Sequence, residues 1–320
     1  MSATQTVFMF SGQGSQYFQM GRQLFDTDDV FRQWMQRLDA LAQKHAGQSV
    51  LEAIYSGSKA QTFDRTLLTH PAIFMVEYSL AQSLMRAGVQ PDLTLGASLG
   101  SFAAAAVAGF LDVEDAMLAV LQQASTFEAR CERGGMIAIV DDPSLFCAPF
   151  LSGSADLAGI NFGSHFAVST RQEHIDSIVA ELRQRNVTHQ RLAVSFAFHS
   201  RWIDQVRAPF ESFMRSIPRS RGRLPLVCCD QAVPLLDLPE DFFWRVVRQP
   251  MRLPDTLANL EIKGDYRYID VGPSGTMATF VKYGLPSTSR STAHAVLTPF
   301  GQDQKNFTAV IRNSLSPIAS

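Results

Sequence analysis

The chain has 320 residues, of which 46% are hydrophobic and 18% are charged, and its formal net charge is −2. A chain of this size and composition can bury a core and split into one large and one smaller folding unit, so it is not a disordered protein. The near-neutral charge, without a long run of like charges, excludes binding of nucleic acid or of an anionic membrane through bulk electrostatics.

Cysteine usage and hydropathy predict the cellular setting. The four cysteines include no pair with the C-x-x-C spacing of metal or redox motifs; they are Cys131, Cys147, Cys228 and Cys229. The first apolar run spans only about five residues, too few for a signal peptide, and no apolar span reaches the roughly 18 residues that a membrane helix needs. We therefore expect a cytoplasmic protein that acts as a monomer and has no metal or other cofactor.

Short apolar segments alternate with amphipathic ones over most of the chain. In the first half, the hydrophobic pattern predicts buried strands over 6–10 and 91–95. It also predicts helices over 30–45, 71–86, 102–110 and 113–130. Strands that alternate with helices in this way are typical of a parallel sheet covered on both faces.

The pattern changes after Gly134 and Gly135. Here a small α+β unit of roughly sixty residues is expected, with a helix over 172–185 and strands over 136–140, 166–170 and 190–195. The larger unit then resumes with helices over 201–214, 241–248, 253–261 and 304–315 and strands over 225–229 and 266–271. We therefore predict a large domain made of residues 1–130 and 198–320, and a small inserted domain made of residues 131–197.

The pentapeptide from Gly96 to Gly100 has the G-x-S-x-G pattern of a nucleophile elbow, with Ser98 at its centre. Glycine at both ends removes the Cβ atoms that would clash in a sharp turn from strand to helix. The serine hydroxyl then stands at a helix N-terminus, where it can attack a carbonyl group. Because such pentapeptides also occur in ordinary Gly/Ser loops, the prediction depends on the apolar strand before it and the Ala-rich helix after it.

A serine nucleophile needs a base, and His199 is the best placed of the seven histidines. It lies between a predicted strand and a predicted helix, where the positive end of the helix dipole favours the neutral imidazole of a general base. A capping or core role is the structural alternative for this residue. For His70 and His165 the structural interpretation is the favoured one.

Five motifs, in the same order along the chain, resemble those of malonyl-CoA:acyl carrier protein transacylases and of polyketide synthase acyltransferases. They are a GQGSQ loop, a T-Q-P-A segment, a GHSLG elbow, an AFHS segment and an E-x-G-P segment, matched here within 10–16, 69–73, 96–100, 197–200 and 270–273. The resemblance extends from Phe8 to about Phe307. It implies an α/β protein, with an α/β-hydrolase-like large domain built on a parallel sheet and an inserted small ferredoxin-like α+β domain.

The resemblance also implies a role for each matching residue. Ser98 would carry the acyl group, and His199 would take its proton and later activate the second acceptor. The backbone N–H groups of Gln13 and Leu99 would form the oxyanion hole. A backbone carbonyl at Gln249 would orient the histidine, so a dyad is expected and no acid-based triad. The implied partner is an acyl carrier protein with an acyl chain on its phosphopantetheine arm.

The implied acyl pocket departs from the family pattern. Malonyl-specific members bind the substrate carboxylate with an arginine, and Gln123 stands at that position, where an amide cannot supply the guanidinium charge. Ala97 replaces the usual histidine before the nucleophile and Ser101 the usual glutamate after it, which leaves more room for an uncharged chain. Phe198 keeps the malonyl-type signature. Asn161 matches an asparagine beside the family pocket, a structural turn residue being its alternative.

The GASLG elbow together with glutamine in place of arginine resembles the stand-alone acyl hydrolases of trans-acyltransferase polyketide synthases. It implies an enzyme that removes acyl chains from carrier-protein thioesters through an acyl-Ser98 intermediate. A trans-acting acyltransferase that loads an uncharged or malonyl-type unit onto a carrier fits the same residues, and a catalytically silent protein that docks on the synthase is the third alternative. Malonyl binding could be rescued only if Arg86, Arg130 or Arg133 reached the pocket.

Overall fold

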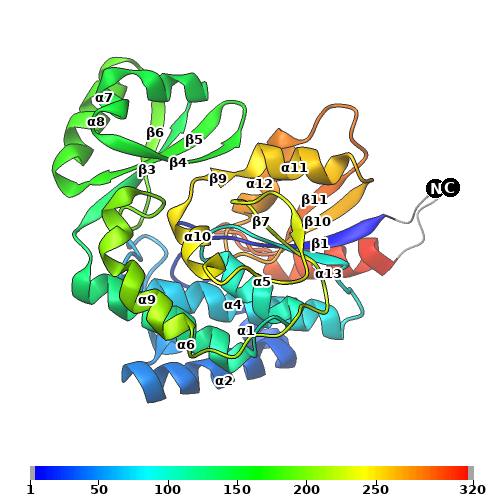
Figure 1. Cartoon of the computed structure of the whole chain (residues 1–320). Coiled ribbons are helices and arrows are strands. Elements are labelled where there is room, and N and C mark those ends of the chain that lie inside the picture. The colour runs from blue at the N-terminus through cyan, green and yellow to red at the C-terminus, as the bar shows by residue number, and fades with distance from the viewer. Residues whose placement is uncertain (1–3, 316–320) are drawn as a thin grey trace.

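A six-stranded sheet forms the centre of the larger unit in the computed structural model, which describes residues 4–315 (Figure 1). Its strands are β1 (Gln5–Phe10), β2 (Leu93–Gly96), β7 (Leu226–Cys228), β8 (Pro234–Leu235), β10 (Tyr266–Asp270) and β11 (Thr292–Ala295). Their spatial order is β11-β10-β1-β2-β7-β8, and all neighbours are parallel except β7 and β8. The predicted parallel sheet is therefore present.

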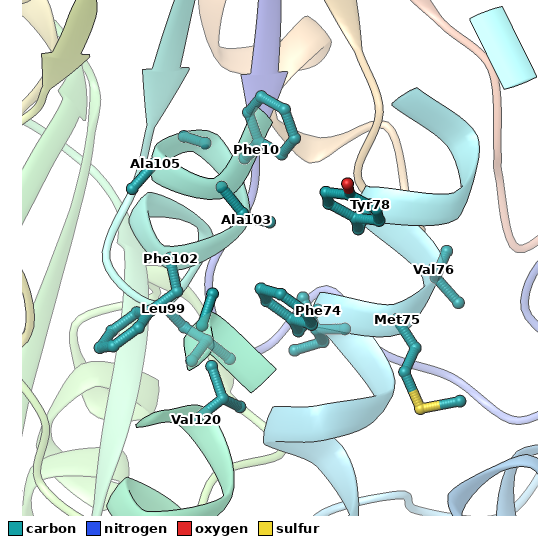
Figure 2. Close-up of a cluster of buried hydrophobic side chains, with 14 of the residues drawn as sticks. Phe10, Phe74, Met75, Val76, Tyr78, Leu99, Phe102, Ala103, Ala105 and Val120 are labelled. Carbon is teal, nitrogen blue, oxygen red and sulfur yellow. The ribbon is translucent and has the colours of Figure 1, made fainter. Parts of the chain in front are cut away.

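Helices cover this sheet on both faces, because alternate residues of β1 belong to two different cores. Phe8 and Phe10 join the main core, whereas Val7 and Met9 join a second one. In the main core, α4 (Thr66–Arg86), α5 (Gly100–Ala108) and α6 (Val113–Arg130) pack together (Figure 2). The other helices of this unit are α1 (Arg22–Thr27), α2 (Asp29–Ala46), α3 (Val50–Ser56), α9 (Arg207–Met214), α10 (Phe242–Arg248), α11 (Leu253–Glu261), α12 (Thr276–Gly284) and α13 (Asp303–Leu315).

The start of α4 differs from the prediction. The sequence predicts a helix from residue 71, but the helix begins at Thr66, and Pro71 lies inside it. Proline in a helix removes one backbone hydrogen bond and bends the chain, a cost that tertiary packing can offset. Most of α4 is buried, including both Thr66 and Pro71, so packing holds this first turn in the helix.

A second sheet of five strands lies in the smaller unit. Its strands are β3 (Gly134–Val140), β4 (Ala155–Phe162), β5 (His165–Arg171), β6 (Thr188–Arg191) and β9 (Met251–Arg252), in the order β6-β3-β5-β4-β9. The short helices at Pro143–Cys147 and α7 (Pro149–Ser152) follow β3, and α8 (Gln172–Gln184) follows β5. The mixed α/β class is thus confirmed. The names α/β-hydrolase-like and ferredoxin-like, and the domain boundaries, stay predictions.

Three segments of the chain differ from the expected elements. The strand β4 was not predicted, since only half of its residues are buried and its apolar pattern is broken. The strand expected over 190–195 ends at Arg191. Residues 192–200 then cross to the larger unit as an irregular segment, where Gln16 donates from its side chain to the carbonyl of Ala193 at 2.8 Å. The helix expected over 201–214 is a 3₁₀ helix, Arg201–Val206, followed by α9.

The two sheets meet beside the carboxyl ends of the parallel strands. β9 comes from the chain of the larger unit but pairs in parallel with β4 of the smaller one, with Met251 opposite Gly159. In open α/β sheets, ligands bind at the carboxyl ends of the strands. Among residues 4–315, none of the helices combines the length and the apolar character that a membrane span requires.

Candidate active site

Ser98 lies at the turn between β2 and α5 with a backbone φ of 52°. A non-glycine residue in this left-handed region costs about 1–3 kcal/mol and is typical of functional sites. The flanking glycines are sterically required, because a Cβ on Gly96 would stand 2.5 Å from the Ser101 Cα and one on Gly100 would stand 2.3 Å from the Phe10 carbonyl oxygen. The elbow predicted from the sequence is therefore the geometry that the chain adopts.

His199 reaches this serine from the segment that crosses between the units. Its Nε2 lies 2.8 Å from the Ser98 Oγ, and its Nδ1 lies 2.6 Å from the Gln249 carbonyl oxygen. Because a carbonyl can only accept, Nδ1 carries the proton and Nε2 accepts the Ser98 hydroxyl. The His199 backbone also has a positive φ, 59°, and its N–H donates to the Val247 carbonyl at 2.9 Å. The dyad expected from the resemblance has the geometry of a nucleophile and its general base.

Burial keeps the His199 imidazole neutral. Removal from water is the largest cause that lowers its pKa, to about 4, with a smaller contribution from the Arg248 charge. The hydrogen bond to the Gln249 carbonyl acts in the opposite direction. A helix dipole was expected to favour the neutral form, but the helix after His199 is only the short 3₁₀ helix, so desolvation is the physical cause.

The loop after β1 places the Gln13 backbone beside the nucleophile. A Cβ on Gly12 would stand only 2.9 Å from the Ser98 Cβ, so glycine lets the two segments approach closely. Within residues 4–315, the backbone N–H groups of Gln13 and Leu99 donate no hydrogen bond. They are therefore free to bind an oxyanion. The Gln13 side chain donates to the Thr69 hydroxyl at 2.8 Å, which ties the loop to α4.

A buried carboxyl group that was not predicted from the sequence binds this loop on the side of α4. Glu77 of α4 is fully buried, and its Oε1 accepts the Ser11 backbone N–H at 2.6 Å and the Ser11 hydroxyl at 2.9 Å. Burial raises the pKa of Glu77 well above its ordinary value, and the charge of Asp270 adds to this. The signal in the sequence is a single glutamate within the otherwise apolar stretch 72–78.

A cavity of about 340 Å³ opens beside the dyad, between the two units. Ala97, Phe198 and Asn161 line it, as the resemblance implied. The remaining lining residues come from the loop after β1 (11–15), from the smaller sheet (Met136, Ala138, His165, Ala167, Gln190, Leu192) and from the larger unit (Cys229, Met251, Leu253, Ser274, Thr276, Met277, Thr279, Phe280), besides Ser98 and His199. None of these side chains is an arginine, lysine, aspartate or glutamate, so Arg86, Arg130 and Arg133 do not reach the cavity.

Two of the residues that were expected to shape the pocket lie outside its lining. Gln123 of α6 is fully buried, and neither its Oε1 nor its Nε2 has a hydrogen-bond partner within residues 4–315. Ser101 is also buried and packs against Gly96. Asn161, in contrast, faces the cavity, where its Nδ2 lies 2.9 Å from the His165 Nδ1. A substrate contact of Gln123 therefore stays a prediction.

Sequence comparison finds relatives that are similar along nearly the whole chain. The chain is 43% identical over 314 residues to the polyketide biosynthesis acyltransferase homolog BaeD of Bacillus velezensis, covering 97% of both proteins. It is also 43% identical over 307 residues to the polyketide biosynthesis acyltransferase homolog PksD of Bacillus subtilis, covering 95% of both. These relatives have almost the same length as the chain described here.

Solved structures share the fold. The loading acyltransferase of the avermectin polyketide synthase superposes with a TM-score of 0.88 at 24% identity, covering 96% of this chain and 99% of that one. An acyltransferase domain of the salinomycin polyketide synthase superposes with a TM-score of 0.84 at 26% identity, over 96% of this chain and 72% of that one. The family profile described as acyl transferase domain matches residues 7–318. With its elbow serine and paired histidine, the chain belongs to this acyl transferase domain family.

Proposed function

We propose that this protein hydrolyses acyl thioesters on acyl carrier proteins of a polyketide synthase. The observation that carries the proposal is a cavity without a charged side chain beside the hydrogen-bonded Ser98–His199 pair. A malonyl carboxylate in such a cavity would lose its hydration without gaining a counter-ion, at a cost of several kcal/mol. Uncharged acyl chains meet no such penalty. The relatives named for polyketide biosynthesis support the synthase as the setting.

The mechanism follows from the two hydrogen bonds that the imidazole of His199 makes. As the Ser98 Oγ attacks the thioester carbonyl, its proton passes to Nε2, and the Nδ1–H remains bonded to the Gln249 carbonyl. The N–H groups of Gln13 and Leu99 stabilise the oxyanion of the tetrahedral intermediate, an effect of about 3–4 kcal/mol for one donor. The C–S bond then breaks, and the thiolate takes the proton from Nε2. This leaves an acyl-Ser98 ester and a free carrier thiol.

Water completes the reaction in a second step of the same kind. His199 takes a proton from the water, the resulting hydroxide attacks the acyl-Ser98 carbonyl, and the ester C–O bond breaks as Nε2 returns the proton to the Ser98 oxygen. The products are a free carboxylic acid and the original enzyme. A second carrier thiol in place of water would give transfer, so the alternative of a trans-acting acyltransferase uses the same intermediate. The small Ala97 beside the nucleophile favours water, since it leaves space next to the ester.

Intact-protein mass spectrometry tests the proposal directly. Acetyl-, butyryl- and malonyl-carrier protein would each be incubated with the enzyme and with an excess of a second, unacylated carrier of different mass. Hydrolysis predicts that the first carrier loses its acyl mass, that free acid accumulates and that the second carrier stays unacylated. Acyl mass on the second carrier would instead establish the transferase alternative. The Ser98→Ala variant is the control, because it keeps the cavity and lacks the nucleophile.

A further inference from the structure

The peptide group between Gly12 and Gln13 carries one of the two N–H groups proposed for the oxyanion hole. A peptide group is planar, and in its trans form the C=O and the N–H point in opposite directions. All peptide bonds among residues 4–315 are trans. Whatever holds the Gly12 carbonyl oxygen therefore also sets the direction of the Gln13 N–H, which donates to no acceptor within the same residues.

Ser15 holds this carbonyl oxygen with two hydrogen bonds of unequal length. Its backbone N–H donates to the Gly12 oxygen at 3.4 Å, which closes a turn from Gly12 to Ser15. This distance is longer than the roughly 2.9 Å that is usual for such a bond. The Ser15 hydroxyl donates to the same oxygen at 2.8 Å. The side-chain bond is therefore the stronger of the two contacts that orient the peptide group.

A second serine orients the hydroxyl of Ser15. Because a carbonyl oxygen can only accept, the Ser15 hydrogen points to Gly12, and the Ser15 Oγ is left to accept a hydrogen bond. The Ser11 hydroxyl donates to it at 2.9 Å and shares its hydrogen with the Glu77 Oε1, which is also 2.9 Å away. Both serines are buried. The hydrogen bonds thus form a chain from Glu77 on α4, through the two serines, to the Gly12 carbonyl.

We propose that Ser15, held by Ser11, is a positioning residue that directs the Gln13 N–H at the oxyanion. Its hydroxyl fixes the plane of the peptide group. It also strengthens the donor, because hydrogen bonds polarise one another and a bond accepted by the C=O increases the positive charge at the N–H of the same group. Oxyanion donors are most effective when they are oriented before the reaction. The inference rests on the proposed function, since the oxyanion forms on the thioester that Ser98 attacks.

Separate contacts hold the rest of this loop. The Gln16 Oε1 accepts the Gly14 backbone N–H at 2.7 Å. The Gln16 Nε2 donates to the carbonyl oxygens of Phe63 and Ala193, at 2.9 and 2.8 Å. None of these three bonds involves the Ser15 hydroxyl. Loss of that hydroxyl should therefore leave the loop beside the nucleophile and free only one peptide group.

The test compares Ser15→Ala with the wild type on a butyryl-carrier protein, and the readout is release of the free carrier thiol. Thiol release accompanies both hydrolysis and transfer, so the result does not depend on which acceptor reacts next. We expect kcat to fall about ten- to a hundredfold, less than for the loss of a whole oxyanion donor. KM should change by less than about twofold, because the oxyanion does not exist in the bound ground state.

Two inhibitors separate oxyanion binding from ground-state binding. The first is a trifluoromethyl ketone on a pantetheine arm. The Ser98 Oγ bonds to its carbonyl carbon, the C=O electron pair moves to the oxygen, and the serine proton passes to the His199 Nε2, which gives a tetrahedral oxyanion. The second is the butyl thioether of pantetheine, which has no carbonyl group. In Ser15→Ala, affinity for the ketone should weaken by about the same factor as kcat, and the Kd of the thioether should change by less than about twofold.

Ser83→Ala is the matched control for stability. Ser83 of α4 is buried and, like Ser15, has a hydroxyl with two hydrogen-bond contacts, to the Asp28 Oδ1 at 2.9 Å and to the Ser79 carbonyl at 3.1 Å. Both variants should lower the melting temperature by similar amounts, because each removes a buried hydroxyl and its two contacts. Ser83→Ala should leave kcat and both inhibitor affinities unchanged.

Two outcomes overturn the inference. One is a folded Ser15→Ala variant with kcat within about twofold of the wild type. The other is an equal loss of affinity for the ketone and the thioether, which would assign Ser15 to the shape of the cavity. If Ser15→Ala does not fold, Ser15→Cys decides, since a thiol has nearly the same shape but is a weak donor: an unchanged kcat overturns the proposal, and a lower kcat with the same KM supports it.

The proposed function fails on a different observation. Transfer of the butyryl group to a second carrier protein, without free acid, would contradict hydrolysis and leave the role of Ser15 intact, because both reactions form the same oxyanion. A wild type that releases no carrier thiol at all would contradict the proposed function itself.

Discussion

Two buried histidines, His199 and His70, differ in the hydrogen bonding of their ring nitrogens. His199 has a partner at each ring nitrogen, whereas His70 has none among residues 4–315. Burial lowers the pKa of both, to about 4 for His199 and about 3 for His70. The paired ring is held in one tautomer and one orientation, as catalysis requires.

The unpaired ring illustrates a different principle. A buried polar group without a partner costs about 1–3 kcal/mol, and evolution tolerates such a cost at functional sites. The same holds for Gln123, with two unpaired atoms on the facing helix. The comparison teaches that burial alone does not make a catalytic histidine: two hydrogen bonds orient the ring of His199, and the ring of His70 has neither within the described residues.

Removal of the nucleophile has the largest expected effect on the paired side of this comparison. Ser98→Ala should lower the rate of acid release from acyl-carrier thioesters by more than about a thousandfold, the range seen when nucleophiles of such enzymes are removed. The fold should persist, because alanine fits the space of serine. The left-handed backbone at this position is retained, since alanine also has a Cβ atom. Retention of more than about a thousandth of the rate by a folded variant would contradict the serine mechanism.

A charge placed at position 123 should change selectivity. Gln123→Arg should raise the ratio of malonyl to acetyl turnover by about 10- to 100-fold, the scale of a bidentate charge-assisted contact. The same arginine should lower the melting temperature in the absence of substrate, because its buried charge has no partner. Paired rates for acetyl- and malonyl-carrier check this prediction. An unchanged ratio, or a wild type that consumes malonyl as fast as acetyl, would show that Gln123 does not determine which acyl group the enzyme prefers.

Substitution of Glu77 tests how the oxyanion loop is held. Because burial raises the pKa of Glu77 and so favours its neutral form, Glu77→Gln should preserve the acceptor for Ser11 and retain most of the activity. Glu77→Leu should leave the Ser11 N–H unpaired, with a cost of about 1–3 kcal/mol in stability and a fall mainly in kcat. Urea unfolding and steady-state kinetics measure both effects. Equal activity of the two variants would show that the loop needs no support from this side chain.

The pH dependence separates the two histidines. Only neutral His199 can act as the base, so kcat/KM should stay level from pH 8 to below 6 and fall with a midpoint of about 4. A midpoint near 6.5 would contradict the burial of the ring. Both histidines have a lower pKa in the folded protein, so below about pH 6.5 the unfolded chain binds more protons. The stability that the two neutral rings contribute is therefore complete above about pH 6.5, and it is lost as the pH falls toward about 4 for His199 and about 3 for His70. Between pH 7 and pH 4, the free energy of unfolding measured with urea should therefore fall less for His70→Leu than for the wild type.

Surface charge should have the smallest effect. Arg201 and Arg207 are exposed cations that an acidic carrier protein would attract, but each has a carboxylate of its own, from Asp156 at 3.5 Å and Glu211 at 3.0 Å. We expect turnover of carrier-bound substrate to fall only about two- to fivefold between 0.01 and 0.15 M salt. Rates over this range check it. A rate that does not depend on salt would exclude electrostatic docking and leave the chemistry untouched.

The sequence by itself determined the parts of the site that depend on local chemistry. The elbow is readable because only glycine fits beside Ser98, and a Cβ at Gly96 or Gly100 would overlap the neighbouring backbone. The helix Val113–Arg130 was predicted with the observed bounds, since its apolar period extends over the segment and Asp112 caps its start. The place of His199 next to Ser98 was expected from the ordered motifs of the family.

The tertiary structure decided whatever depends on segments distant along the chain. The cause of the low pKa of His199 is burial by other segments, and the carboxyl group of Glu77 supports a loop 66 residues away. Gln123 is fully buried and lies outside the lining of the open cavity, which no period or motif encodes. Neither burial nor an unpaired atom is a property of a residue and its sequence neighbours. Both arise when α4, α6 and the crossing segment pack against each other and exclude water.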